Sequence, residues 1–375
     1  MPPLTGKWRA SVPLFAFKPG PGRADTGHPE RSTPHAMARI DPVSATRWIT
    51  AAAVQHGDAL PQHLMQRLQI SRRQANLLLR RLEALQWVRS CGTPRAPRHV
   101  PGPLRQVVQR YPLAGLQEDR PWRQDFAPNF QLPPAVQAMA QHAFTELLNN
   151  AIEHSGGGSV TVSMRQTPLQ LQLLVSDDGV GLFQRVAEHF ALDEPAVAML
   201  ELAKGKLTSD PDRHCGHGLF FTAQLADVFD LHANTAAFQR RGWDGGHWHA
   251  QRPATKAGTS IYWAVATDTP RTLEQVLMAH SASGQGWAFE RTRVPLALLL
   301  PPGARQLSSR AEARRALARL ERFAEADLDF SGVEQVGHGF ADELLRVGAR
   351  RLPGLRLHPS AMAPAVGAML GSIGG

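Results

Sequence analysis

The stretch 141–155, QHAFTELLNNAIEHS, constrains the fold of this chain more than any other part of the sequence. At helical spacing it forms one apolar face from Phe144, Leu147, Leu148, Ala151 and Ile152. Glu146 and Asn150 are four residues apart and project side by side, and His154 continues their line one turn later. A carboxylate can accept a proton from water, and an amide oxygen can bind Mg²⁺. The pattern predicts a packed helix whose polar residues could accept a proton and bind a cation. Polar pairs at this spacing also occur on ordinary solvated helix faces.

Acidic and glycine residues follow this helix in an ordered series. Residues 159–164 and 169–175 alternate in polarity, which predicts two strands with a turn around Pro168. The second strand runs into Asp177-Asp178-Gly179-Val180-Gly181. A carboxylate at a strand end can accept a hydrogen bond from the exocyclic amine of a base, and glycines let the backbone approach a ligand closely. The stretch therefore favours a base-recognition pocket.

Two further glycine motifs lie downstream. Gly216-His217-Gly218-Leu219 precedes a helical pattern that extends through Ala226, and Gly258-Thr259 enters another strand. Backbone N–H groups at a helix start favour phosphate. These motifs add a candidate phosphate site to the candidate base pocket.

The motifs ExxxNAxxH, DxGxG, GxGL and GT, in this order, resemble the GHKL ATP-binding fold shared by histidine kinases, gyrase, MutL and anti-sigma serine kinases. The resemblance covers residues 125–267. It implies that Asn150 holds Mg²⁺ and that Asp177 reads the adenine amine. The other residues that it implies in ATP binding are His154, Gly179, Gly181, Gly216, Gly218, Leu219 and Thr259. Glu146 matches the general base of the ATPase members, whereas Asp178 departs from the Asn that many members carry.

The composition limits the class of protein. The 375 residues suffice for two or three domains, and no apolar run approaches the roughly 18 residues that cross a bilayer. The N-terminus lacks a signal-peptide pattern, and Cys91 and Cys215 are too far apart in sequence to suggest a disulfide framework. We therefore expect a cytoplasmic protein.

The positive charge is concentrated in one region. The formal net charge is +9, and 12 arginines against 3 acidic residues lie between Leu60 and Arg123. The excess in that segment equals the excess of the whole chain. A local basic excess indicates an anionic partner, although a generally arginine-rich composition gives the same balance.

Residues 41–100 predict three helices and a hairpin, after a disordered tail over residues 1–40. We expect helices over 45–56, 61–68 and 72–85. Ser71 is a suitable N-cap for the third helix, and Gln74 completes a capping box. The expected inward residues of that helix are Ala75, Leu78, Leu79, Leu82 and Leu85. A strand begins at Trp87-Val88, and residues 91–98 form a short basic loop.

This order of elements resembles a winged helix-turn-helix. The resemblance implies double-stranded DNA as a partner, with a recognition helix whose groove-facing residues are Arg72, Arg73, Gln74 and Asn76. It implies phosphate contacts by Arg80, Arg95 and Arg98. The alternative is a dimerisation or docking module whose arginines are only solvated.

Residues 101–124 read as a linker, with a short helix over 102–110. Residues 192–204 look helical, and the polar stretch 205–214 lies where GHKL proteins carry a mobile lid. Lys204 and Lys206 could reach a phosphate there, or be merely solvated. His247 and His249 could form a metal pair, but strand histidines in a hairpin explain them better.

Residues 285–375 alternate strand and helix patterns, which predicts a small α/β sheet. We expect strands over 289–294, 297–300 and 326–330, and helices over 310–323 and 340–351. The run LDFSGVEQVGHGFADELLRV resembles the STAS-like domain of anti-sigma-factor antagonists, which implies a protein partner. Gly337-His338-Gly339 stands where phosphorylated members carry Asp-Ser-Ser, so the phosphoserine is missing.

Together these patterns predict an α+β multidomain protein: a winged helix, a central GHKL two-layer α/β sandwich and a C-terminal STAS-like domain. The expected function is an ATP-responsive, Mg²⁺-dependent regulator of transcription. The alternatives are an anti-sigma-type serine protein kinase or ATPase whose winged helix docks a protein, and a nucleotide-bound scaffold without turnover.

Overall fold

A computed structural model of the chain describes residues 42–93, 95–192, 194–208, 216–253, 256–284 and 286–374. The predicted disordered tail over residues 1–40 lies outside the described residues, and so does Cys215. Within the described ranges, no helix is both long enough and apolar enough to cross a membrane.

The N-terminal helical unit, residues 42–101, consists of four helices and a hairpin. Its helices are α1 (Pro42–Thr46), α2 (Ile49–His56), α3 (Leu60–Leu68) and α4 (Arg72–Ala84). The Ser71 hydroxyl caps α4 by accepting from the Gln74 N–H at 3.3 Å, and Gln74 Oε1 accepts from the Ser71 N–H at 2.9 Å. The predicted capping box is thus present. Leu85 was wrongly predicted to point inward, because α4 ends at Ala84 and the Leu85 side chain is 52% exposed.

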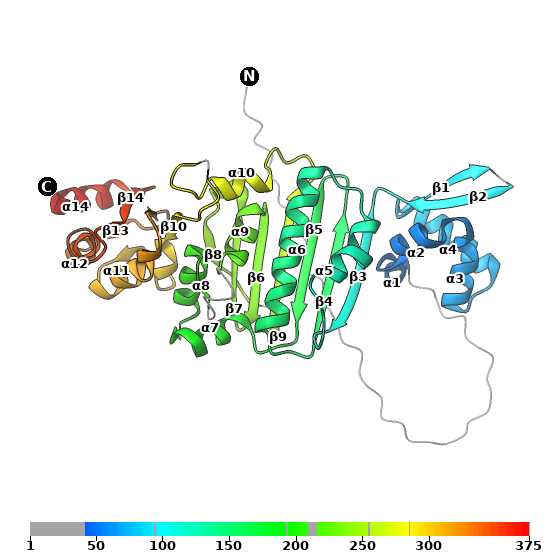
Figure 1. Cartoon of the computed structure of the whole chain (residues 1–375), viewed down its shortest axis with the longest axis horizontal. Helices are drawn as coiled ribbons and strands as arrows, with labels where there is room; N and C mark the ends of the chain where they lie inside the picture. Colours follow the sequence, from blue (N-terminus) through cyan, green and yellow to red (C-terminus); the bar gives the residue numbers. More distant parts are fainter. Residues whose placement is uncertain are drawn as a thin grey trace, which may run out of the picture. The chain divides into compact units, whose positions relative to one another are not determined.

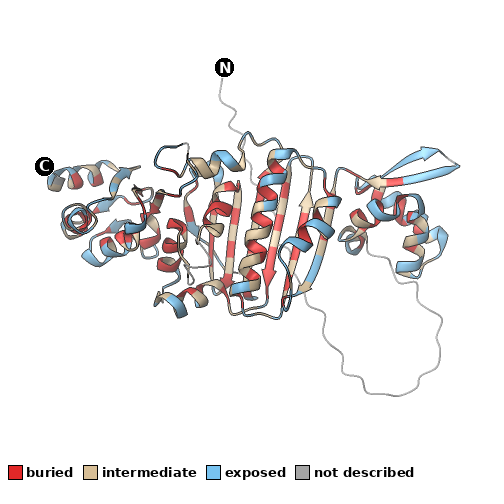
Figure 2. Ribbon diagram, in the orientation of Figure 1, coloured by how far each residue is buried: buried red, intermediate tan, exposed pale blue. Residues whose placement is uncertain are grey.

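The hairpin pairs β1 (Val88–Thr93) with β2 (Ala96–Pro101) in antiparallel register. Only its base is anchored: Trp87 and Val88 are buried, whereas the distal residues are exposed (Figure 2). The single helix expected over 45–56 is wrong, since α1 ends at Thr46 and α2 begins at Ile49; the later elements follow the expected order. The resemblance to a winged helix-turn-helix remains a prediction.

A seven-stranded sheet forms the centre of the described chain (Figure 1). Its strand order is β3-β4-β5-β9-β6-β7-β8, and every neighbouring pair is antiparallel. The strands are β3 (Arg105–Pro112), β4 (Ser159–Gln166), β5 (Gln170–Asp177), β6 (Val228–Asn234), β7 (Ala236–Arg241), β8 (Trp248–Ala250) and β9 (Lys256–Ala266).

The expected linker helix over residues 102–110 is wrong, since residues 105–112 form β3. This strand pairs with β4, from Arg105 opposite Gln166 to Pro112 opposite Ser159. Arg105 and Val107 are buried on one face, which is the period of a strand. After β3 the chain forms α5 (Asp119–Pro121), a π-helical turn (Trp122–Phe126) and a 3₁₀ turn (Ala127–Asn129).

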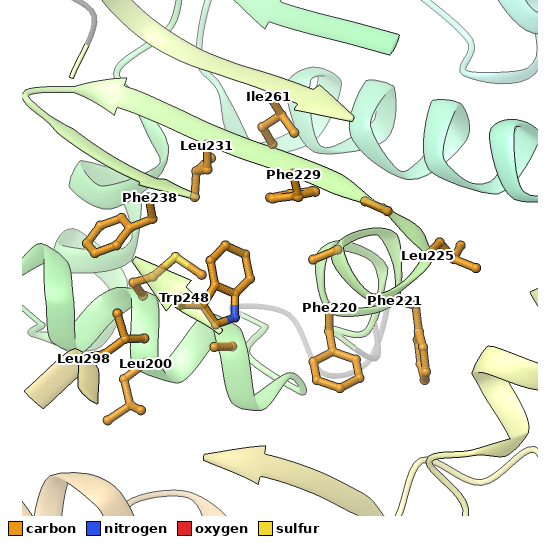
Figure 3. Packing of buried hydrophobic residues seen from close by; sticks show 14 of the residues in the cluster. Leu200, Phe220, Phe221, Leu225, Phe229, Leu231, Phe238, Trp248, Ile261 and Leu298 are labelled. Carbon is orange, nitrogen blue, oxygen red and sulfur yellow. The ribbon is translucent and has the colours of Figure 1, made fainter. Parts of the chain in front are cut away.

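Helices cover one face of this sheet and create its core. They are α6 (Pro134–His154), α7 (Leu182–Phe190), α8 (Pro195–Lys204), α9 (Gly218–Leu225) and α10 (Leu273–Met278). The predicted apolar face of α6 packs inward: Phe144, Leu147, Leu148 and Ala151 are buried, and Ile152 is half-buried against the same core. Helix and sheet thus form two layers. Figure 3 shows Phe229, Leu231 and Ile261 on strands of the sheet and Phe220 and Phe221 on α9, and all five belong to one buried cluster.

The C-terminal unit, residues 286–374, contains a parallel three-stranded sheet in the order β10-β12-β14 and a two-stranded pair β11-β13. Its strands are β10 (Arg291–Pro295), β11 (Gln306–Leu307), β12 (Glu325–Asp329), β13 (Gln335–Val336) and β14 (Arg356–Ser360). Its α-helices are α11 (Arg310–Leu317), α12 (His338–Ala341), α13 (Gly348–Arg351) and α14 (Pro364–Gly374), with a π-helical turn (Asp342–Val347) between α12 and α13. The strand expected over 297–300 is instead a 3₁₀ turn (Leu296–Leu299).

Both flanking units contact the central sheet. The Val108 N–H of edge strand β3 donates to the Arg47 carbonyl at 3.0 Å, and the Gln106 N–H donates to the Thr50 hydroxyl at 3.0 Å. At the other edge, β8 packs against the 3₁₀ turn Leu296–Leu299 of the C-terminal unit, and Leu298 of that turn belongs to the same buried cluster as Leu200 of α8 (Figure 3).

Candidate nucleotide-binding site

Asp177 ends β5 at the predicted base-recognition position, and its two carboxylate oxygens differ. Oδ1 accepts from the Gly179 N–H at 2.9 Å and from the Thr259 N–H at 3.0 Å. Oδ2 has no hydrogen-bonding partner among the described residues, although the side chain is only 6% exposed. Because Oδ2 is not among the fully enclosed atoms without a partner, it can accept a hydrogen bond from water or from a ligand amine.

Asp178, the departure from the GHKL pattern, has a structural role. Its Oδ1 accepts from the N–H groups of Gly158 and Ser159 at 2.9 Å each, and its Oδ2 accepts from the Ser159 hydroxyl at 2.6 Å. Hydrogen bonding to Ser159 lowers the pKa of Asp178 below its usual range. The second carboxylate therefore fastens the start of β4 to the end of β5.

The glycines of this motif occupy crowded backbone positions. Gly179 lies against the Ser155 carbonyl, where a Cβ would collide. Gly181 has φ +90°, in the region that L side chains avoid, and it faces the Asn234 amide. The motif requires glycine at both places because α6 and the β6–β7 turn leave no room for side chains.

Asn234 was missed in the sequence, although it connects two of the predicted motifs. Its Nδ2 donates to the Val180 carbonyl at 2.7 Å, and its Oδ1 accepts from the Gly258 N–H at 3.1 Å. Asn234 is in the left-handed region, with φ 51°, at the turn between β6 and β7. An Asn in a short turn between two strands was the available signal.

Thr259 and Lys256 also lie at this end of the sheet. The Thr259 hydroxyl accepts from the Leu182 N–H at 3.0 Å, which fixes the start of α7 beside Asp177. Lys256, not predicted as a site residue, donates to the Ser176 hydroxyl. Burial lowers the pKa of the Lys256 ammonium, and the attraction of Asp177 and Asp178 opposes that shift. Lys256 thus places positive charge close to the two carboxylates.

The polar line of α6 forms a second part of the site. Glu146, Asn150 and His154 are half-buried on successive turns of that helix. Among the described residues, the Asn150 side chain has no hydrogen-bonding partner, so its amide oxygen can accept a cation or a water. The His154 ring lies 3.8 Å from the Glu153 carboxylate, near the C-terminal end of the helix.

The glycine turn before α9 approaches the same line. Gly218 starts α9, and a Cβ there would overlap the Glu146 carboxylate. Gly216 has φ +67°, and Leu219 is half-buried in the first turn of α9. The structure therefore brings the Gly216–Leu219 motif to Glu146. Residues 209–215, between this turn and Thr208, lie outside the described residues.

Lys204 and Lys206, considered for phosphate contact, are instead tied to the C-terminal unit. Lys204 is 1% exposed, forms a 2.7 Å ion pair with Glu201, and donates to the Arg315 and Ala318 carbonyls at 3.0 Å. Lys206 donates to the Arg322 carbonyl at 2.5 Å. The buried Lys204 ammonium donates to three acceptors and is not available to a phosphate, whereas the half-buried Lys206 ammonium donates to the Arg322 carbonyl.

The histidines considered as a metal pair have carboxylate partners. His247 Nδ1 lies 3.1 Å from Asp329 Oδ2, and His249 Nε2 lies 3.4 Å from Asp244 Oδ2. No group of three or more His, Cys, Asp or Glu residues suited to a metal is found in the described ranges. Strand histidines with structural partners remain the better interpretation.

The residues expected to bind DNA are surface residues of the N-terminal helical unit. The exposed ones are Arg72, Arg73, Asn76, Arg80, Arg95 and Arg98. Gln74 is half-buried, and its Oε1 accepts from both the backbone N–H and the hydroxyl of Ser71. Its predicted role in base reading competes with this cap. Arg98 also lies 3.4 Å from Asp58 in an exposed ion pair, which is weak in water.

These residues fit ATP and Mg²⁺ in chemistry. Asp177 offers its Oδ2 to an amine, Asn150 offers an amide oxygen to a hard cation, and the α9 start offers backbone N–H groups.

The comparison with known families agrees with this geometry. Residues 94–238 match a family model described as the histidine kinase-like ATPase domain. The match begins before β3 and ends within β7. Strand β9, which carries Gly258 and Thr259, lies beyond the matched residues in sequence. In the sheet, however, β9 lies between β5 and β6, which the match includes. No curated protein is significantly similar to the chain.

Proposed function

We propose that this protein binds ATP with Mg²⁺ and uses nucleotide binding to regulate transcription. The observation that carries the nucleotide part is the Asp177 carboxylate: two backbone N–H groups fix one oxygen, and no described residue donates a hydrogen bond to the other. The exocyclic amine of adenine would supply the missing donor. The match of residues 94–238 to the histidine kinase-like ATPase domain supports the same ligand.

The polar line of α6 would serve the triphosphate end. Asn150 would hold Mg²⁺ through its amide oxygen, and Mg²⁺ would neutralise the phosphate charge. Glu146 would orient and deprotonate the attacking water or hydroxyl, a role that contributes roughly 10²–10⁴-fold to a rate. His154, Gly179, Gly181, Leu219 and Thr259 would line or shape the pocket around the nucleotide.

Calorimetric titration with MgATP tests the nucleotide part. Asn150→Ala should weaken MgATP binding and remove its dependence on Mg²⁺, whereas Asn149→Ala, on the neighbouring position of the same helix, should not. Equal affinity for MgATP in the wild type and Asn150→Ala would exclude the metal assignment.

DNA binding would be the output of the N-terminal helical unit, acting as a winged helix-turn-helix. Arg72, Arg73 and Asn76 are exposed at the start of α4, the part of such a helix that meets base edges. Arg80, Arg95 and Arg98 are exposed nearby and could contact phosphates.

A selection of random duplexes by the full-length protein tests this part. The wild type should recover a sequence preference, and Arg72→Ala/Arg73→Ala should lose it, at roughly 1–3 kcal/mol for each base-reading contact. Arg120→Ala/Arg123→Ala, two exposed arginines outside the unit, should behave as the wild type. Absence of any preference, with binding that does not respond to salt, would leave the unit as a protein-docking module.

A second candidate is a serine protein kinase of the anti-sigma type or an ATPase. The position of Glu146 against the Gly218 turn favours it, because a carboxylate placed at the predicted phosphate end can act as a base. The parallel strands of the C-terminal unit are compatible with a STAS-like domain that binds a protein partner. ATP labelled with ³²P at its γ-phosphate tests this candidate. Release of labelled phosphate would indicate an ATPase, and transfer of the label to a partner protein would indicate a kinase.

A further inference from the structure

The C-terminal unit reaches the glycine turn of the candidate site through Phe289, the second residue before β10. This side chain is 5% exposed. Its ring centroid lies 4.9 Å from that of His217 and 4.6 Å from that of Phe220. A Cβ at Gly205 would lie 2.6 Å from the Phe289 ring. Phe289 is therefore packed against residues on both sides of the undescribed segment.

Lys206 and Arg322 form a second connection to the same place. Lys206 Nζ donates to the Arg322 carbonyl at 2.5 Å, and Arg322 Nη1 donates to the Lys206 carbonyl at 2.9 Å. The Lys206 ammonium also lies 4.3 Å from the ring centroid of Phe323. The Lys206 N–H donates to the Gly216 carbonyl at 3.1 Å. Lys206 therefore links Arg322 of the C-terminal unit to Gly216.

The turn that these contacts hold is pressed against Glu146. Gly218 has no space for a Cβ because the Glu146 carboxylate fills it. Packed interiors transmit displacements, since they contain few voids that could absorb them. A shift of Phe289 or Arg322 would therefore move the start of α9 relative to Glu146.

We propose that Phe289 and Arg322 are positioning residues, through which the C-terminal unit sets the Gly216–Gly218 turn against Glu146 and so sets nucleotide affinity. This inference rests on the proposed nucleotide function. It adds a reciprocal consequence, because nucleotide binding must then change the C-terminal unit's affinity for a partner by the same factor.

The first experiment compares Phe289→Leu with Phe330→Leu in the full-length protein. Phe330 is a fully buried phenylalanine directly after β12 in the same unit, and it has no aromatic contact with the glycine turn among the described residues. Phe289→Leu should weaken MgATP binding by about 5-fold or more, the lower end of usual coupling between sites. Phe330→Leu should leave affinity for MgATP unchanged. Equal losses in both variants would mean general destabilisation and would overturn the proposal.

Amide hydrogen exchange measured without nucleotide tests the positioning role independently of the proposed nucleotide function. Phe289→Leu and Arg322→Ala should accelerate amide exchange in residues 216–221, whereas Phe330→Leu should not. Arg322→Lys should restore slow exchange, because a lysine can still donate to the Lys206 carbonyl. A wild type that fails to bind MgATP would refute the nucleotide function. Unchanged exchange at the turn in Phe289→Leu and Arg322→Ala would refute the positioning role.

Discussion

Replacing Asp177 by Asn would exchange one carboxylate oxygen for an NH₂ group and keep the other oxygen. The new carbonyl oxygen can keep the hydrogen bonds from the Gly179 and Thr259 N–H groups at 2.9 and 3.0 Å. The new NH₂ group then occupies the place of the free Oδ2. Rotating the amide to avoid this would direct its NH₂ at two backbone donors, so the orientation is fixed by the fold. An NH₂ group cannot accept from the adenine amine.

The expected loss of affinity follows from the hydrogen bond removed. A hydrogen bond to a charged group contributes about 1.5–3 kcal/mol, so the Kd for MgATP should rise by about 10- to 150-fold. Binding of inosine triphosphate, which has an acceptor oxygen in place of the amine, should fall less or improve. The preference of Asp177→Asn should therefore shift from ATP toward inosine triphosphate.

Calorimetry with both nucleotides measures this preference. Asp178→Asn is a suitable control, since both Asp178 oxygens bond to the backbone or side chains around Ser159. A thermal melt should show that Asp177→Asn is folded. If Asp177→Asn keeps the wild-type ratio of ATP to inosine triphosphate affinity, Asp177 does not read the base.

Further predictions concern turnover, DNA and pH. Glu146→Gln should bind MgATP but release phosphate roughly 10²–10⁴-fold more slowly, while Glu153→Gln on the exposed side of α6 should match the wild type in a phosphate-release assay. Arg95→Ala should weaken binding to all duplexes alike and reduce the slope of log affinity against log salt by roughly one, measured by fluorescence anisotropy. Burial lowers the pKa of His217 and His280 below the ordinary 6.5, so the unfolded chain binds protons that the folded chain does not. Their contribution to the free energy of unfolding should be complete above that pH and be lost as pH falls below it, which thermal melts between about pH 8 and pH 5 would show as a falling midpoint.

Local patterns in the sequence predicted local structure well. The capping box of α4 depends on residues three apart, and Ser71 and Gln74 make the expected bonds. The apolar face of α6 follows from its own period, and Asp177 lies at its strand end as expected. Each of these features depends on residues that are close in sequence, within one or two helical turns or a single strand.

Features set by distant partners were not predictable in this way. Residues 105–112 form a strand because β4, about fifty residues later, provides the pairing, and the segment itself reads as a Pro- and Arg-containing linker. Lys204 and Lys206 are bound by carbonyl groups more than 110 residues away. Asn234 belongs to the site only because β6 lies beside β9. A single sequence carries no direct signal for such contacts.

The two edges of the central sheet have a consequence for how this protein can be handled. An open edge strand presents unpaired N–H and C=O groups to which another chain can add. Here the backbone of β3 bonds to Arg47 and Thr50 of the N-terminal helical unit, and the short strand β8 packs against residues 296–299 of the C-terminal unit. Trimming the chain to its central sheet would uncover both edges, and the fragment would tend to assemble edge to edge into insoluble material. The flanking units therefore act as built-in solubility elements for the sheet.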